Sequence, residues 1–312
     1  MPNNVNSLVQ RLFDLGHFRN PAMPTGVTEE DLPKLELHDA AVKIALRSFQ
    51  EFMAADFDRL ALEEHGRIGI ADGEVGPATE RLFQVERCGC PDYAVEAANG
   101  SGSWPAGCHT EWPKNHAFKI RVNKNGIPSF LSPQFEAVFD RVQQAYANIG
   151  IVFFRGDDSD NYNTYTTFQN LGGSTIGLAI VPNSPRCGEK IWSRFDPGYN
   201  PGDTFNQWCR LLCHEWGHNM GLSHSRGGIM NPSITSGAFT PTAWRGDPSE
   251  SILVRWFGGA PVNIGGQPPD DPPPTNPGGI DLTQVYFSGT FTLSDKAGNP
   301  LREFILTPKP KV

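Results

Sequence analysis

Three of the eight histidines in this 312-residue chain lie within eleven residues of one another, at His214, His218 and His224. Histidines four positions apart on a helix project from one face, so the first two can reach a single metal ion. Glu215 follows the first histidine and can hold a water molecule without ligating the metal itself. Gly221 can adopt a positive φ, which ends the helix and turns the chain back so that the third histidine becomes a ligand. The spacing therefore predicts a metal centre.

This donor set indicates a catalytic zinc ion rather than a structural one. Three neutral imidazoles leave one tetrahedral position open for water, whereas a structural site is closed by four protein ligands. Zinc lowers the pKa of bound water to about 7, and a nearby carboxylate can then take its proton. A helix carrying incidental surface histidines is the alternative, and three histidines in eleven residues argue against it.

The pattern from His214 to His224 resembles the HExxHxxGxxH signature of the metzincins, and Gly228–Pro232 resembles their methionine turn. Ser225, directly after the third histidine, is similar to the matrixin branch, the matrix-metalloproteinase-like enzymes. The resemblance implies a zinc endopeptidase that hydrolyses peptide bonds in proteins. It implies that His214, His218 and His224 are the zinc ligands. It also implies that Glu215 is the general base for the zinc-bound water and that Met230 forms an apolar floor beneath the metal.

An upstream segment, Arg87–Asp92, is similar to the matrixin cysteine switch PRCGxPD, in which a cysteine ligates the catalytic zinc and keeps the zymogen latent. By position that cysteine is Cys88, while Cys90 occupies the variable slot and Glu86 replaces the expected proline. A thiolate is a better zinc ligand than water, and its tether gives it a high effective concentration. Cys88 is therefore expected to hold the enzyme inactive, and a buried structural cysteine is the alternative.

The same resemblance implies two substrate-binding features. Gly177–Ile180 matches the edge strand that matrixins pair with an extended substrate through main-chain hydrogen bonds, which assigns Leu178 and Ala179 to substrate binding. A plain buried strand is the alternative for this segment. Arg210 matches the position that often sets the depth of the S1′ pocket, where a large charged side chain would shorten the pocket.

The chain departs from the matrixin pattern where those enzymes usually bind a second, structural zinc through histidines and an aspartate. No histidine lies between Arg155 and Cys213, so we expect no second zinc of that kind. Asp157, Asp158 and Asp160 could bind Ca²⁺, but an ordinary solvated acidic turn is the interpretation we favour.

The N-terminal part of the chain is predicted to be helical. Apolar residues at helical spacing predict a first amphipathic helix, and Gly16 after them suits its C-cap. These apolar residues are Val5, Leu8, Val9, Leu12 and Phe13. Residues 36–85 form a second helical unit, whose apolar stripe comprises Leu37, Ala41, Ile44, Ala45, Phe49, Phe52 and Met53. The stretches 41–50 and 71–82 are similar to the peptidoglycan-binding-like fold of matrixin propeptides.

The middle of the chain alternates between strand and helix patterns. Phe118, Ile120 and Val122 alternate as in a half-buried strand, and Ser132–Pro133 suits the start of a helix. The apolar face of that helix comprises Phe135, Val138, Phe139, Val142, Ala145, Tyr146 and Ile149. Ile151–Phe154 and Leu178–Val181 are predicted buried strands, so this order indicates a crossover unit and a mixed sheet.

The predicted fold class is α+β, in four parts. Residues 1–95 form a helical, peptidoglycan-binding-like propeptide domain, and residues 103–262 form a metzincin catalytic domain with a twisted mixed sheet, an active-site helix and a methionine turn. Residues 263–280 form a Pro/Gly-rich linker, because 11 of the 19 residues from Pro261 to Gly279 are glycine or proline. Residues 281–312 form a short β-hairpin tail.

Composition and net charge restrict the classes of binding partner that the chain can have. The 26 basic and 34 acidic residues give a net charge of −8, which argues against nucleic-acid binding. Apolar runs such as Ile151–Phe154 are far shorter than the roughly 20 residues that span a bilayer, so no transmembrane segment is expected. Six cysteines in a chain of this length do not indicate a disulfide scaffold, and Cys209 and Cys213, one helical turn apart, suit buried thiols.

Location and function retain alternatives. No secretory signal is visible, yet the family resemblance favours an extracellular or cell-envelope monomer that acts on a protein or peptide substrate. A different hypothesis is a cell-wall-associated protein whose N-terminal region binds peptidoglycan, or a wall peptide hydrolase. An intracellular or phage-borne protease is a third hypothesis, prompted only by the missing signal.

Overall fold

The computed structural model describes residues 5–54, 56, 63–64, 67–68, 71–93, 117–155, 164–180, 191–234, 236–256, 289–294 and 300–306. The chain divides into two compact units, Met1–Gly265 and Gly266–Val312, and the division falls within the predicted linker. The linker at 263–280 and the acidic residues Asp157, Asp158 and Asp160 lie outside the described residues.

The N-terminal residues of the first unit form a helical cluster, as predicted. It contains α1 (Val5–Asp14), α2 (Ala40–Phe52) and α4 (Pro77–Leu82), with 3-10 turns at His17–Arg19 and Glu29–Lys34 and a short hairpin of β1 (Glu63–Glu64) and β2 (Arg67–Ile68). Gly16 ends the first helical segment with a φ of 82°, the left-handed conformation that glycine adopts without strain.

The predicted stripe on α2 is correct except at one position. Ala45, Phe49, Phe52 and Met53 are buried, but Ile44 is 37% exposed. The helix buries Val42 and Leu46 instead, because its core face is centred on these two positions and Ala45. The prediction of a helical unit therefore holds, with its apolar face rotated.

A six-stranded sheet forms the centre of the first unit, in the order β3-β7-β8-β6-β4-β5. The strands are β3 (Arg87–Cys88), β4 (Ala117–Val122), β5 (Val152–Arg155), β6 (Thr164–Phe168), β7 (Thr175–Ala179) and β8 (Ile191–Phe195). Neighbours pair in parallel except β7 and β8, which are antiparallel among the described strands. The mixed sheet predicted from the strand–helix–strand pattern is thus present.

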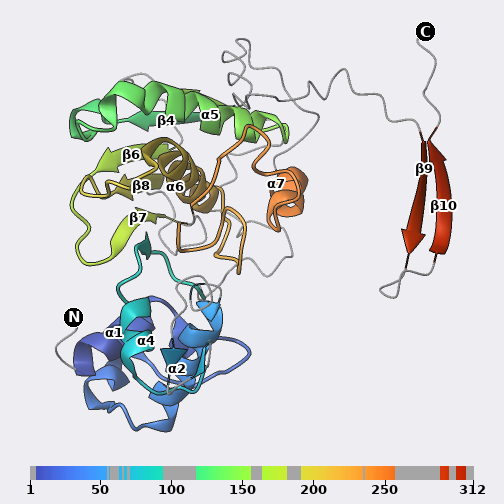
Figure 1. The fold of residues 1–312 in the computed structure, drawn as a ribbon. Helices are drawn as coiled ribbons and strands as arrows, with labels where there is room; N and C mark the ends of the chain where they lie inside the picture. The colour runs from blue at the N-terminus through green and yellow to red at the C-terminus, as the bar shows by residue number, and fades with distance from the viewer. Residues whose placement is uncertain are drawn as a thin grey trace. The chain divides into compact units, whose positions relative to one another are not determined.

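Two helices, α5 (Phe135–Ala147) and α6 (Thr204–Asn219), pack against each other and share one apolar core with the sheet (Figure 1). All seven predicted apolar residues of the first helix region are buried. Its start differs from the prediction, because Ser132–Gln134 form a 3-10 turn and the α-helix begins at Phe135. Proline suits a first turn of either kind, which is why the sequence did not separate the two.

The remaining described elements are α7 (Glu250–Trp256) in the first unit, and β9 (Gly289–Ser294) and β10 (Pro300–Leu306) in the second. The last two strands pair antiparallel. No helix among the described residues is both long and apolar enough to cross a lipid bilayer.

Candidate metal centre

Helix α6 carries the first two histidines of the signature. Its N-terminus is capped by Asp203, whose side chain accepts a hydrogen bond from the backbone N–H of Asn206 at 3.3 Å. At the other end, Gly221 has a φ of 96°, so the chain turns back after the helix as the spacing predicts. His214, His218 and His224 are all buried.

The C-terminal half of α6 is fastened to the sheet by polar bonds. The Asn219 amide donates to the carbonyls of Ile180 and Trp192, each at 3.0 Å, and its oxygen accepts from the Thr164 hydroxyl at 2.7 Å. The Trp216 indole donates to Thr166 at 3.1 Å. These hydrogen bonds hold the face of α6 that carries the histidines at a fixed distance from the sheet. Sequence reasoning missed Asn219, because its partners lie 27 to 55 residues away.

Each imidazole uses its Nδ1 as a hydrogen-bond donor. His214 donates to the Ile229 carbonyl at 2.8 Å and His218 to the Leu222 carbonyl at 2.7 Å. His224 donates to the carboxylate of Asp92 at 2.7 Å. Because a carbonyl or carboxylate can only accept, Nδ1 of each ring carries a proton, and Nε2 is the nitrogen left to offer a lone pair to a metal ion.

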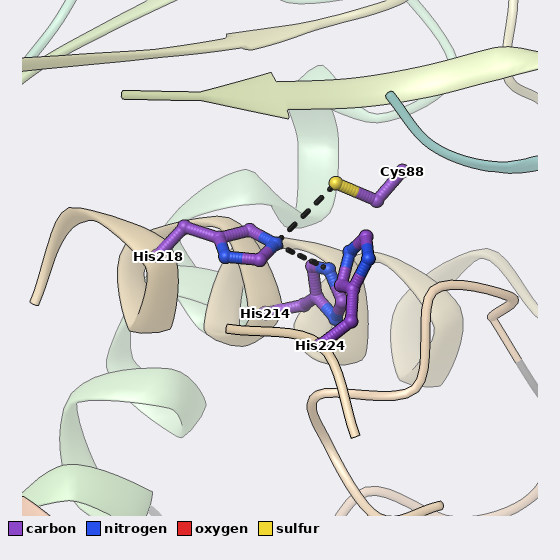
Figure 2. Close-up of side chains that lie close together, drawn as sticks. All are labelled: Cys88, His214, His218 and His224. Atoms are coloured by element: carbon purple, nitrogen blue, oxygen red, sulfur yellow. Dashed lines mark hydrogen bonds between the residues drawn. The ribbon is translucent and has the colours of Figure 1, made fainter. Parts of the chain in front are cut away.

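The Nε2 atoms converge with a thiol (Figure 2). His214 Nε2 and His218 Nε2 are 3.0 Å apart, and Cys88 Sγ is 3.5 Å from His218 Nε2. One ligand atom from each of Cys88, His214, His218 and His224 lies within 4.8 Å of the others. Nitrogens bound to one tetrahedral zinc ion lie about 3.3 Å apart, so two facing lone pairs at this separation fit a shared cation.

The Nε2 atom of His224 also indicates a shared cation. Its Nε2 is buried and has no hydrogen-bond partner, which is costly unless another group satisfies the lone pair. Three imidazoles and one thiol are the donors that zinc prefers. The residues present therefore fit a zinc ion.

Glu215 belongs to a second cluster of candidate ligand atoms, together with Cys88, Cys90 and His218. Burial is the largest influence on its carboxyl group and raises its pKa well above the ordinary value, and the nearby Cys90 adds to this rise. A Cβ added at Gly177 would collide with the Glu215 carboxylate. The absence of a side chain at Gly177 is therefore what makes room for Glu215.

Met230 packs against α6, in the segment that resembles the methionine turn. It is fully buried, and a Cβ added at Gly217 of α6 would lie 2.7 Å from its Sδ. The turn is fastened by the Ser225 N–H, which donates to the Met230 carbonyl at 2.9 Å, and by Asp247, which accepts from the Ile229 N–H at 2.6 Å. The turn thus supports His214 through the Ile229 carbonyl.

The segment Arg87–Cys90 lies along the edge of β7. Arg87 and Cys88 pair with Thr175 and Gly177, and the Gly89 N–H donates to the Gly177 carbonyl at 2.8 Å. Among the described strands, β7 would otherwise end the sheet on this side. The predicted substrate-binding residues Leu178 and Ala179 therefore belong to a strand whose outer edge is covered by the predicted switch.

The sequence included Asp92 as the last residue of the switch-like segment but gave it no role, and it gave no signal for His17. The buried Asp92 carboxylate accepts from His224, from His17 Nε2 at 2.9 Å, and from Arg87. Burial alone would raise the pKa of Asp92, but the Arg87 charge and the two imidazoles hold it well below its ordinary range. His17 and Asp92 are 75 residues apart, so no local pattern connects them.

Arg210 lies one helical turn before His214, on α6, and is partly buried. Its Nε is buried without a hydrogen-bond partner. Cys209 and Cys213 are buried free thiols, as predicted.

Comparisons with known proteins bear on this arrangement. No protein-family model matches the chain. The chain is 28% identical to a matrilysin of Rattus norvegicus over 72% of its own length and 78% of the relative's. It is 29% identical to an interstitial collagenase of Aquarana catesbeiana, over 52% of the chain and 38% of the relative, and 25% identical to one of Equus caballus, over 72% and 50%.

These similarities support membership of the matrixin family. The mostly parallel sheet with its two packed helices fits a matrixin catalytic domain. The matrixin-like chain spans half or less of the length of the two collagenases. The comparisons add no support for the cell-wall alternative, which stays a hypothesis.

Proposed function

We propose that the chain is a zinc-dependent endopeptidase held latent by its own N-terminal segment. The observation that carries this proposal is the convergence of one ligand atom each from His214, His218, His224 and Cys88, while the Nδ1 of every histidine is engaged elsewhere. The similarity to matrilysin and collagenases supports the same activity class.

In this proposal the three histidines hold the zinc ion. When bound, zinc supplies Lewis-acid polarisation of water and of the substrate carbonyl. The bonds from Nδ1 to Ile229, Leu222 and Asp92 fix the ring orientations, so little reorganisation is needed at the reacting centre. Met230 provides the apolar floor.

Glu215 is the proposed general base. Burial raises the pKa of its carboxyl group above the ordinary value, and a higher pKa makes the carboxylate a stronger base. A carboxylate next to a metal ligand in sequence, on the same helix, can accept a proton from water and return it to the leaving amine.

Latency follows from the proposed role of Cys88. Residues 1–95 are proposed to act as a propeptide, residues 103–262 as the catalytic domain, residues 263–280 as a linker and residues 281–312 as a tail. The Cys88 N–H donates to the Pro232 carbonyl at 2.8 Å, and the Arg87 backbone pairs with β7, so the thiol is held over the histidines. We also propose an extracellular location, by analogy with the relatives.

The proposed substrate is an extended peptide that adds to the outer edge of β7. Gly177, Leu178 and Ala179 supply main-chain groups there, and the propeptide segment uses this edge in the latent chain. Arg210 is proposed to limit the depth of the neighbouring pocket, in keeping with its buried, unpartnered Nε.

The general-base role is tested by Glu215→Gln in a Cys88→Ala chain, assayed on a protein substrate. Removal of one general base lowers kcat by about 10²- to 10⁴-fold, and the zinc content should stay at the level of the matched chain. Glu136→Gln is the control, because this glutamate is 62% exposed on α5. Cleavage by Glu215→Gln at the rate of its background would refute the proposed mechanism.

Latency is tested in the same assay. The full-length parent should cleave slowly, and Cys88→Ala should cleave faster, because the thiol competes with water for the metal. A chain without both thiols of this segment, Cys88→Ala/Cys90→Ala, that folds and binds zinc but cleaves no faster than the parent would contradict the proposed switch.

A further inference from the structure

A second thiol lies beside the proposed metal centre. Cys90 follows Cys88 by two residues, and its Sγ is buried within a cluster of ligand atoms that also includes Cys88, Glu215 and His218. These four atoms all lie within 4.8 Å of one another. His218 therefore belongs to both clusters of candidate ligands and has both thiols within reach.

The contacts that hold Cys90 in its present position are weak. Its thiol donates to the Ala179 carbonyl at 3.3 Å and accepts from the Ala179 N–H at 3.4 Å, both of which are sulfur hydrogen bonds. Its backbone N–H donates to Cys88 Sγ at 3.3 Å, so the Cys88 sulfur lies against the backbone of Cys90. Loss of these bonds would cost little compared with a zinc–thiolate bond.

The backbone of the segment keeps Cys90 close even when Cys88 changes. Gly89 N–H is bonded to Gly177, and a Cβ at Gly89 would lie 2.7 Å from the Thr175 methyl, so the segment lies directly against β7. The Cys90 sulfur already lies within 4.8 Å of the Cys88 sulfur and of a ring nitrogen of His218. A thiol tethered in this way has a high effective concentration at the site.

We propose that Cys90 is a second thiol ligand of the metal centre, which replaces Cys88 when that thiol is lost or displaced. The exchange would be a ligand substitution without oxidation: the Cys88 thiolate, or the water that has taken its place, would leave the metal, the Cys90 S–H would give its proton to the neighbouring Glu215 carboxylate, and the Cys90 sulfur would take the vacated position. The Cys–Gly–Cys segment thus provides two thiols for one position. This inference rests on the proposed zinc site.

The test compares four full-length chains loaded with Co²⁺ in the presence of a reductant: parent, Cys88→Ala, Cys90→Ala and Cys88→Ala/Cys90→Ala. A thiolate bound to Co²⁺ gives a charge-transfer band in the near ultraviolet, which imidazole ligands do not give. Intact mass and thermal unfolding check that each chain is uncut and folded. The parent and both single variants should keep the band, and only the double variant should lose it.

Three results would overturn the inference: loss of the band in Cys88→Ala to the level of the double variant, persistence of the band in the double variant, or its absence from the parent. The last result would also remove the proposed Cys88 ligation.

Proteolysis by the zinc-loaded chains separates the inference from the proposed function. The double variant should cleave at least about tenfold faster than Cys88→Ala. An inactive double variant with the expected cobalt spectra would contradict the protease proposal alone. Equal cleavage rates for the double variant and Cys88→Ala would contradict only the proposal that Cys90 is a second thiol ligand.

Discussion

Gly177 is the residue on which the position of Glu215 most directly depends. It lies on β7, where its missing side chain leaves space for the carboxylate, and a Cβ there would also lie 2.9 Å from Leu211 Cδ1 on α6. A close contact in a packed interior displaces the softer neighbour. The neighbour that moves here is the proposed general base.

We therefore expect Gly177→Ala to impair cleavage more than it impairs folding. Overpacking of a core costs about 1–3 kcal/mol, whereas a displacement of roughly 1 Å in a catalytic group can cost about 100-fold in rate. The measurements are kcat/KM and thermal unfolding in the Cys88→Ala chain. Gly202→Ala is the control, because no heavy atom lies within 4 Å of an added Cβ there. Unchanged cleavage by Gly177→Ala would show that the carboxylate is not held as described.

The residues of the metal centre differ in how far the sequence could predict them. The spacing of His214, His218 and His224 is local, so a helix and a turn suffice to bring the rings together. Asp92 and His17 contribute through contacts across 132 and 75 residues, which depend on how the N-terminal helices pack. A local pattern carries no signal for such pairs.

At the scale of elements, the turn His17–Arg19 connects the N-terminal helices to the switch segment. The buried His17 ring makes two hydrogen bonds. Its Nδ1 is bonded to the Ser48 hydroxyl of α2 at 3.1 Å, and its Nε2 is bonded to the Asp92 carboxylate at 2.9 Å. Burial is the larger influence and lowers the pKa of His17, although the Asp92 carboxylate partly offsets it. The folded chain thus favours the neutral ring.

The sign of the pH dependence follows. The folded pKa of His17 is lower than the unfolded value of about 6.5, so His17 contributes its stability above that pH and loses it as the pH falls toward the folded value. Between pH 7 and 5, the free energy of unfolding should fall more steeply in the parent than in His17→Gln, by at most about 1.4 kcal/mol per pH unit.

Urea unfolding of chelator-treated chains at several pH values checks this expectation. His38→Gln serves as the control and should keep the slope of the parent, because the His38 side chain is 77% exposed. Parallel slopes for the parent and His17→Gln would contradict the assignment of a neutral, buried imidazole at this turn.

Sequence periodicity predicted a helix or strand best where one face of that element packs against a core. The periodicity predicted every buried position of α5 except Ala147, since the helix has a single apolar stripe. The face of α2 was misjudged at Ile44, because its alanines and partly apolar flanks permit two nearby stripes. The pairing of β3 with β7 could not be predicted, because a two-residue strand has no periodicity of its own.

At the scale of the whole molecule, the two large clusters of buried apolar side chains both lie in Met1–Gly265. One cluster joins α1, α2 and α4, and the other joins the sheet with α5 and α6. The second unit consists of a hairpin, β9 and β10, among its described residues. A hairpin of this size adds little independent stability.

A chain that ends at Gly265 is therefore expected to keep the thermal midpoint of the full chain and the cleavage rate of its Cys88→Ala form. A chain that ends at Ser249 is the matched control, because it also lacks Leu253, whose fully buried side chain belongs to the larger core. Loss of such a side chain costs about 2–5 kcal/mol, so this control should melt earlier. A lower midpoint for the Gly265 chain would show that the second unit stabilises the first.

The metal content of the purified full-length chain tests the central claim most directly. Three converging imidazoles predict one equivalent of zinc in the parent and in His38→Gln, whose ring lies on the surface. They predict a large loss of zinc in His214→Ala, because two imidazoles and a thiol remain. A parent without zinc, or a folded His214→Ala chain that keeps a full equivalent, would contradict the account.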